Sequence, residues 1–176
     1  MGGSRTVKTL TVLFVAMTLG ALALMLLEVP PISAGAAETV YDTASPIARG
    51  KWQAMVVHAA TDRTSPVAQG SHFVIERGPS GQYRVTASDA WRKQQPGRHV
   101  GGPWQAQSVG VCVIGDFSQQ GPDQAEFECL MDLVNALQDI CRIPAQRVYL
   151  MRDLDARSTS PGRFFPTGQF SARLLK

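Results

Sequence analysis

The chain has 176 residues, of which 44% are apolar and 18% charged, with 16 Gly and 11 Pro. This composition is that of a globular protein and excludes a disordered, collagenous or coiled-coil chain. The formal net charge of +3 is too small to indicate a nucleic-acid-binding protein. The charge is uneven, because residues 142–176 carry six Arg and Lys176 against only Asp153 and Asp155. This local excess predicts an anionic ligand near the C-terminal segment.

An uncharged apolar segment covers residues 9–27 near the start of the chain. At about 1.5 Å per residue, a helix of this length nearly crosses a ~30 Å hydrocarbon core, which predicts a membrane anchor within residues 1–28. The alternative is a cleaved signal peptide, for which Ala34-Gly35-Ala36 is a suitable small-residue cleavage site.

The basic residues around this segment predict its orientation. Arg5 and Lys8 precede it, and no basic residue follows it before Arg49. The positive-inside rule therefore keeps the N-terminus in the cytoplasm and exports the remainder. We expect either a single-pass membrane protein with an exported C-terminal domain or, after cleavage, a secreted or periplasmic protein.

The three cysteines do not indicate a disulfide scaffold, because an odd number leaves at least one unpaired within the monomer. Cys129 and Cys141 lie on one predicted helix and its end, ~18 Å apart, which is too far for a disulfide. We expect Cys112, Cys129 and Cys141 to be small buried apolar residues.

In chain order, residues 29–50 are rich in Pro, Ala, Ser and Gly, which predicts a linker and a domain over residues 51–176. Short apolar runs predict strands at residues 55–57, 72–75, 83–86, 109–114 and 148–150. Apolar residues at spacings of three and four predict a helix over residues 124–140, with Asp123 as its N-cap. A shorter helix is predicted over residues 167–175. This combination predicts an α/β protein with helices packed on a sheet.

The three histidines, His58, His72 and His99, each lie near the end of a predicted strand or in the Gly-rich loop before one. The segments around them form an ordered series: VVHAAT (56–61), SHFVI (71–75), GRHVGG (97–102), SVGVCVIGDF (108–117), and RD (152–153) followed by SPGRF (160–164). This series resembles the zinc-dependent N-acetylmuramoyl-L-alanine amidases and the peptidoglycan recognition proteins. The resemblance implies a mixed central β-sheet flanked by helices, with a peptidoglycan-binding groove on one face.

The resemblance also implies a zinc ion held by two imidazoles and one thiolate or carboxylate, with a water at the fourth position. His58 stands at the first ligand position, but Met151 replaces the second histidine and Ser160 replaces the Cys or Asp. Ser71 stands where the family usually has a Tyr. A neutral thioether and a serine hydroxyl are poor zinc ligands, so we expect a degenerate site with no tightly bound zinc. Within the wider family, replacement of the ligand Cys by Ser goes with recognition without hydrolysis.

The remaining features predict a binding groove. Guanidinium groups suit the free carboxylates of a peptidoglycan stem peptide, and a tryptophan can stack on a sugar or cover the cleft. The predicted substrate-binding residues are His58, His72, His99, Trp104, Arg152, Arg157 and Arg163. In the alternative interpretation, the arginines are solvated surface charges and the tryptophan caps the core.

We therefore expect a cell-envelope protein that binds peptidoglycan or a muropeptide stem, with its hydrolytic activity lost and no zinc bound. The first alternative is an active N-acetylmuramoyl-L-alanine amidase that binds zinc and cleaves the bond between the muramoyl group and L-Ala. The second is an envelope module that uses the groove to bind a protein.

Overall fold

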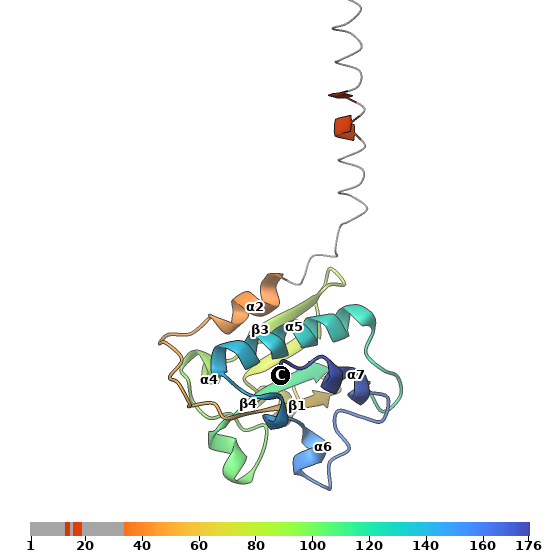
Figure 1. Ribbon diagram of the computed structural model, residues 1–176. Coiled ribbons are helices and arrows are strands. Elements are labelled where there is room, and N and C mark those ends of the chain that lie inside the picture. Colours follow the sequence, from red (N-terminus) through yellow and green to blue (C-terminus); the bar gives the residue numbers. More distant parts are fainter. Residues whose placement is uncertain (1–12, 15, 19–33) are drawn as a thin grey trace, which may run out of the picture. The chain divides into compact units, whose positions relative to one another are not determined.

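The computed structural model describes residues 13–14, 16–18 and 34–176 of the chain. Those from 34 onward belong to one compact unit (Figure 1). Residues 13–14 and 16–18 are helical and exposed. Among the described residues, no helix is long and apolar enough to cross a membrane. Most of the predicted anchor, residues 9–27, lies outside the described part of the chain.

A five-stranded mixed sheet with the order β3-β2-β4-β1-β5 forms the centre of this unit. The strands are β1 (Ala54–Ala60), β2 (Phe73–Arg77), β3 (Tyr83–Ala87), β4 (Ser108–Ile114) and β5 (Val148–Leu150). β1 is parallel to β4 and β5, β2 is parallel to β4, and β3 is antiparallel to β2. The predicted α/β class and the mixed sheet are therefore confirmed, and each predicted strand is present.

Helix α5 (Gln124–Cys141) covers one face of the sheet. The Asp123 carboxylate accepts a hydrogen bond from the backbone N–H of Glu126 at 2.8 Å, as expected of an N-cap. The helix ends where Arg142 adopts a left-handed conformation, with φ 57°. Its buried residues pack with alternate residues of β1, Met55 and Val57, in the main apolar core. All three cysteines are buried, as predicted.

Helix α2 (Ala34–Val40) lies within the predicted linker and packs on the same core. Ala36 is 1% exposed and Val40 is 0% exposed, and the Trp91 indole N–H donates to the Val40 carbonyl oxygen at 3.0 Å. These seven residues of the predicted linker are therefore helical and pack on the core of the folded unit. Two buried residues four positions apart form an apolar face too short for periodicity to reveal.

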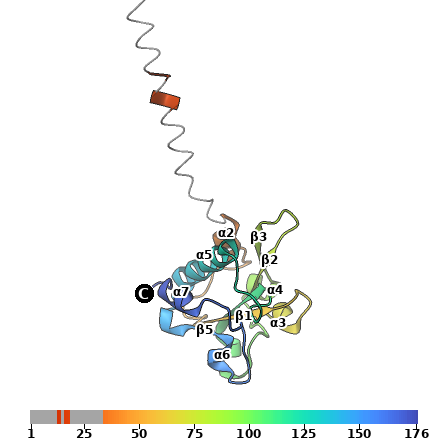
Figure 2. The ribbon, with the colours of Figure 1, turned by 90° about the vertical axis from the view of Figure 1, so that its right-hand side faces the viewer.

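The opposite sheet face carries His58 of β1, Cys112 of β4 and Val74 of β2, and we call it the His58 face. Helix α3 (Pro66–Gln69) packs on this face, where Ala68 joins Val74 and Cys112 in a second apolar cluster. Figure 2 shows α3 and α5 on opposite sides of the sheet.

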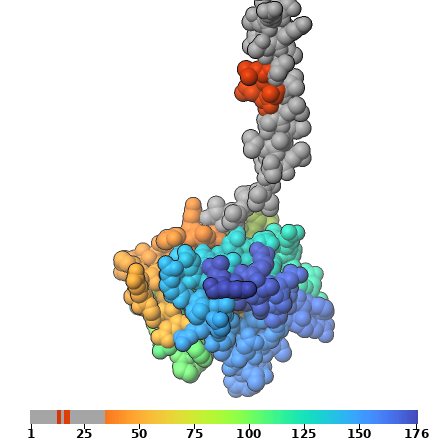
Figure 3. All heavy atoms as spheres, viewed as in Figure 1, coloured from red at the N-terminus to blue at the C-terminus, as the bar shows by residue number. Residues whose placement is uncertain are grey.

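Short helices complete the unit: α4 (Asp89–Arg92), η1 (Gly102–Ala106), η2 (Ala145–Arg147), α6 (Met151–Leu154) and α7 (Thr167–Ala172). The predicted second helix, over residues 167–175, thus ends three residues early. The chain after α7 lies on the surface over α5 (Figure 3). There, the backbone N–H of Leu175 donates to the Gln138 side chain at 3.0 Å.

Candidate functional site

His58 lies on β1 with its side chain fully buried. Its Nε2 is 2.8 Å from the Ser71 hydroxyl oxygen, and that hydroxyl donates to the Val67 carbonyl oxygen at 2.6 Å. Because the Ser71 hydrogen is used on this carbonyl, its oxygen accepts from His58 Nε2–H. His58 Nδ1 therefore carries a free lone pair, and it has no hydrogen-bond partner. Burial lowers the pKa of His58 to about 4, so the imidazole is neutral.

His72, which directly precedes β2, is buried and satisfied at both nitrogens. Its Nε2–H donates to the Gln95 carbonyl oxygen at 2.9 Å, and its Nδ1 accepts from the Gly110 backbone N–H at 2.9 Å. Burial lowers the pKa of His72 to about 4. These bonds tie the loop after α4 to the sheet, which is a structural function.

His99 lies in the Gly-rich loop before η1 and is also buried. Its Nε2–H donates to the Ser108 hydroxyl at 3.0 Å, and that hydroxyl donates to the Trp104 carbonyl oxygen at 2.7 Å. Burial, and next the neighbouring His72 and His58, lower the pKa of His99 to about 3.

The three histidine rings form one buried cluster on the His58 face. Ring centroids are 6.1 Å apart for His58 and His99, and 5.3 Å apart for His72 and His99. None of the three rings is open to solvent. All three are predicted substrate-binding residues, but in this structure they contact one another and the loops that cover them. Direct contact with a ligand therefore stays a prediction.

The structure brings the three expected metal-ligand positions together. Val57 of β1 pairs with Leu150 of β5, and Met151 follows Leu150 as the first residue of α6, so its backbone lies near the end of β1 that carries His58. The Ala59 backbone N–H donates to the Ser160 hydroxyl oxygen at 2.8 Å, which holds Ser160 beside the end of β1. The backbones at these three positions therefore lie near the end of β1, and their role as a metal site stays a prediction.

The side chains at these positions do not suit zinc. The Ser160 hydroxyl accepts from the Ala59 N–H and also donates to the Ala59 carbonyl oxygen at 3.4 Å, so it is engaged with the backbone. Met151 supplies a neutral thioether, which is a poor ligand for Zn²⁺. Within the described parts of the chain, no group of three His, Cys, Asp or Glu residues is placed to hold a metal ion. Among the residues at these three positions, only His58 has a side chain of the kind that zinc prefers as a ligand.

The three predicted carboxylate-binding arginines differ in their partners. Arg157 is exposed and forms an ion pair with Asp155, with Nε and Oδ1 3.1 Å apart. Arg152 and Arg163 have no carboxylate partner among the residues that the structure describes. Their charges are therefore available to an anion, whereas that of Arg157 is already balanced.

Arg152 and Arg163 are held by hydrogen bonds to neutral oxygens near Ser160 in the chain. The Arg152 guanidinium donates to the Gly162 carbonyl oxygen at 3.1 Å and to the Thr167 hydroxyl. The Arg163 guanidinium donates to the Ser118 carbonyl oxygen at 3.0 Å. These contacts satisfy some guanidinium donors without neutralising either charge.

Trp104 is half-buried in η1 and packs against Tyr149 of β5, with ring centroids 5.4 Å apart. Val56 of β1 pairs with Tyr149, so this aromatic pair lies at the β5 edge of the His58 face. The position agrees with both predictions for Trp104, contact with a sugar and coverage of the sheet.

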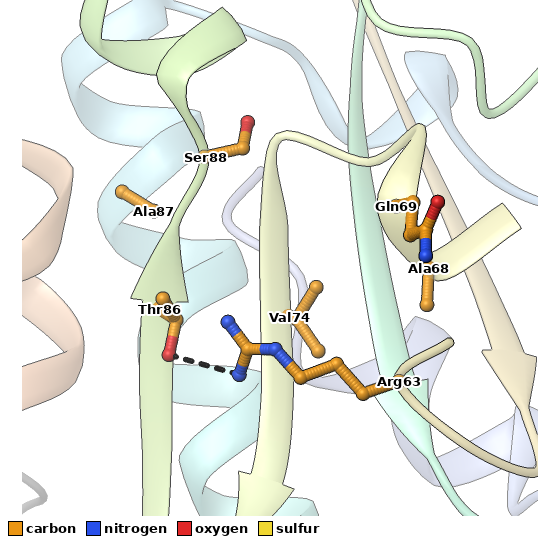
Figure 4. A pocket seen from close by; sticks show the side chains of 7 residues that line it. All are labelled: Arg63, Ala68, Gln69, Val74, Thr86, Ala87 and Ser88. Atoms are coloured by element: carbon orange, nitrogen blue, oxygen red, sulfur yellow. Dashed lines mark hydrogen bonds between the residues drawn. The ribbon is translucent and has the colours of Figure 1, made fainter. Parts of the chain in front are cut away.

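A hollow of about 230 Å³ lies near the β3 edge and includes none of the predicted site residues. Figure 4 shows Arg63 extending across Val74 towards Thr86, whose hydroxyl accepts from the guanidinium at 3.5 Å. The other lining residues are Ala68, Gln69, Ala87 and Ser88. Sequence reasoning missed this hollow. The sequence feature that points to it is the polar loop after β1, which carries Arg63.

Comparison with solved structures finds the same fold in bacterial amidases. The N-acetylmuramoyl-L-alanine amidase endolysin LysCS from Clostridium intestinale is 18% identical, with a TM-score of 0.57 over 74% of this chain and 89% of that chain. The N-acetylmuramyl-L-alanine amidase AmiD from E. coli is 17% identical, with a TM-score of 0.59 over 73% of this chain and 60% of that chain. AmpDh3 from Pseudomonas aeruginosa is 16% identical, with a TM-score of 0.56 over 74% of this chain and 62% of that chain.

The structures of AmiD and AmpDh3 contain ligands. AmiD is in complex with its substrate anhydro-N-acetylmuramic acid-L-Ala-D-γ-Glu-L-Lys, and AmpDh3 is in complex with an anhydromuramic pentapeptide. At these identities the likeness shows a shared fold and not a shared activity.

Comparison of the sequence with curated proteins finds no match. Comparison with protein-family models matches residues 38–163 to the family described as N-acetylmuramoyl-L-alanine amidase. This match covers the whole sheet, α5, and the His58, Met151 and Ser160 positions. The chain therefore belongs to the N-acetylmuramoyl-L-alanine amidase family.

Proposed function

We propose that this protein binds peptidoglycan fragments in the cell envelope and does not hydrolyse them with zinc. Membership of the amidase family supports a ligand of this class, because AmiD and AmpDh3 bind muropeptides with the same fold. Enzymes of the family are zinc-dependent. The observation that carries the proposal is that the three ligand positions converge in the fold while only His58 keeps a zinc-binding side chain.

Loss of the metal removes the means of activating water. In zinc hydrolases, the ion lowers the pKa of its bound water and stabilises the charge that develops on the carbonyl oxygen. Neither Met151 nor Ser160 can supply the second and third charged or imidazole donors that hold such an ion. Ser71, at the position of the usual Tyr, donates its hydroxyl hydrogen to Val67 and so offers none to an oxyanion.

Binding does not need the metal. A stem peptide carries free carboxylates, and guanidinium groups recognise these by charge-assisted hydrogen bonds. Arg152 and Arg163 lack carboxylate partners within the described residues and lie near Ser160, since the Arg152 backbone N–H donates to the Ser160 carbonyl oxygen at 3.0 Å and Arg163 follows Ser160 closely in the chain. We propose that these two arginines hold the stem carboxylates and that Trp104 contacts the sugar.

The test combines metal analysis, hydrolysis and binding. Purified full-length protein is expected to contain far less than one zinc per chain by mass spectrometry and to leave muropeptides uncleaved in chromatography. Calorimetry is expected to detect muropeptide binding that Arg152→Gln and Arg163→Gln each weaken by about 10-fold or more, the value of a charged hydrogen bond. Arg157→Gln is the matched control and is expected to bind as the wild type does, because Asp155 already neutralises Arg157.

Two results would decide for the alternatives. Stoichiometric zinc together with cleavage would show an active amidase. Absence of muropeptide binding, together with a protein partner that stays bound when no sacculi are present, would show an envelope module that binds a protein.

A further inference from the structure

Phe164 is an exposed aromatic residue in the loop that carries Ser160 and Arg163. It is 47% exposed, whereas the next residue, Phe165, is 4% exposed. Phe165 packs in the main apolar core, to which Phe164 does not belong. Packing of the core therefore explains Phe165 and leaves the apolar ring of Phe164 facing solvent.

The Phe164 ring is held by the Arg163 guanidinium, whose central carbon lies over the ring, 4.7 Å from its centroid. The Arg163 Nε–H donates to the Ser118 carbonyl oxygen at 3.0 Å, so the loop after β4 fixes the guanidinium. A cation over an aromatic ring is attracted by the negative charge of the ring face. The guanidinium covers only one face, and it restricts rotation of the ring before any ligand binds.

The backbone around Phe164 is fixed as well. The Phe164 N–H donates to the Phe117 carbonyl oxygen at 2.9 Å. Gly162 has φ 134°, which favours glycine, and a Cβ there would lie 2.4 Å from the carbonyl carbon and oxygen of Phe117. The Arg152 guanidinium donates to the Gly162 carbonyl oxygen at 3.1 Å. A surface fixed in this way loses little conformational entropy when a ligand binds.

An exposed aromatic ring beside a guanidinium suits a ligand that has both an apolar face and carboxylates. The carbon–hydrogen groups on one face of a pyranose ring carry partial positive charge, whereas the face of an aromatic ring carries partial negative charge. A muropeptide has such sugar rings together with the carboxylates of its stem. We propose that Phe164 stacks against a sugar ring of the bound muropeptide and makes the protein prefer sugar-bearing ligands to the bare stem peptide. This inference rests on the proposed function and names the part of the ligand that Phe164 recognises.

This contact is separate from the sugar contact proposed for Trp104. Trp104 lies in η1, which precedes β4, whereas Phe164 is hydrogen-bonded to Phe117, beyond the other end of β4. Trp104 also packs against Tyr149, with ring centroids 5.4 Å apart. Variants of Trp104 and of Phe164 therefore test different contacts.

The test compares two ligands by calorimetry with the full chain. One is a disaccharide tetrapeptide, and the other is the same tetrapeptide acetylated at its amino terminus, which has the stem carboxylates but no sugar. The wild type is expected to bind the disaccharide tetrapeptide more tightly. Phe164→Ala should weaken that binding by about 3- to 10-fold, the value of an aromatic stacking contact, and should leave binding of the acetylated tetrapeptide unchanged.

Further variants separate stacking from other effects. Phe164→Tyr keeps an aromatic ring and should bind both ligands as the wild type does. Phe164→Leu keeps an apolar side chain without an aromatic face and should weaken binding of the disaccharide tetrapeptide. Tyr41→Ala is the matched control, because Tyr41 is an exposed aromatic residue after α2, 70% exposed, and its loss should leave both affinities unchanged.

Three results would overturn the proposal. Phe164→Ala could bind the disaccharide tetrapeptide as tightly as the wild type, or it could weaken binding of both ligands equally, which would show a disturbed loop. Equal affinity of the wild type for the two ligands would refute this inference and leave the proposed function standing. Binding of neither ligand by the wild type would refute both.

Discussion

Mild acid should destabilise this protein because three neutral histidines are buried in one cluster. The pKa values of His58 and His72 are about 4 and that of His99 is about 3 in the folded protein, against 6.5 for an exposed histidine. Between pH 6.5 and about 4 the unfolded chain therefore binds more protons than the folded one, and stability falls as the pH falls. From pH 7 to pH 5, each histidine removes about 2 kcal/mol, which gives about 5–6 kcal/mol for the three.

Glu126 of α5 acts in the opposite direction. Burial, and next the nearby Asp123 charge, raise its pKa to about 7. The folded protein therefore takes up this proton before the unfolded chain does, and stability gains about 2 kcal/mol between pH 7 and pH 5. The net loss is then about 4 kcal/mol, a large part of the 5–15 kcal/mol that stabilises a typical domain.

Urea unfolding followed by tryptophan fluorescence measures this loss directly. Trp52 and Trp91 are both buried, and the Trp52 ring lies 4.8 Å from the His72 ring, so the signal reports on the cluster. Glu126→Gln removes the opposing proton uptake and should enlarge the loss between pH 7 and pH 5. An unfolding free energy that is equal at the two pH values, or higher at pH 5, would refute the assignment of three neutral buried histidines.

Other variants test other parts of the structure. The double change Met151→His and Ser160→Cys should raise zinc content from negligible to near one ion per chain, and no zinc in this variant would show that the residue match is misaligned. A chelator of divalent metals should leave the melting temperature of the wild type unchanged, and a decrease of many degrees would contradict the donor analysis. Gly110→Ala should destabilise the fold by about 1–3 kcal/mol in urea, because the added methyl would lie 2.3 Å from the His99 ring. A reporter fused after Lys176 should be exported, and a cytoplasmic signal would disprove the predicted topology.

The fold was largely predictable where elements are long or rich in β-branched residues. A run of buried valines predicts the strand β4, and apolar residues at spacings of three and four predict the helix α5. The four-residue helices α3, α4 and α6 were missed, because one turn contains no full period of apolar residues. Helix α2 was missed for a related reason, since its buried face consists of only two residues.

The candidate site was predictable as a set of positions but not as a set of contacts. Motif order predicts His58, Met151 and Ser160 at one site, and the pairing of Val57 with Leu150 and the hydrogen bond between Ala59 and Ser160 bring their backbones near one another. Sequence could not show that the Ser160 hydroxyl binds the backbone of β1, or that Arg157 alone of the three arginines has a carboxylate partner. Both depend on how loops fold back on the sheet, which local sequence patterns do not specify.

Helix α2 constrains the timing of maturation. The small-residue site at Ala34-Gly35-Ala36 lies in its first turn, and the Ala36 side chain is buried in the core. Proteases cut exposed, extended chain, so folding encloses this bond. Cleavage there would have to precede folding, during export, and would remove Ala36 from the core. A chain that folds first would therefore stay uncut at this position.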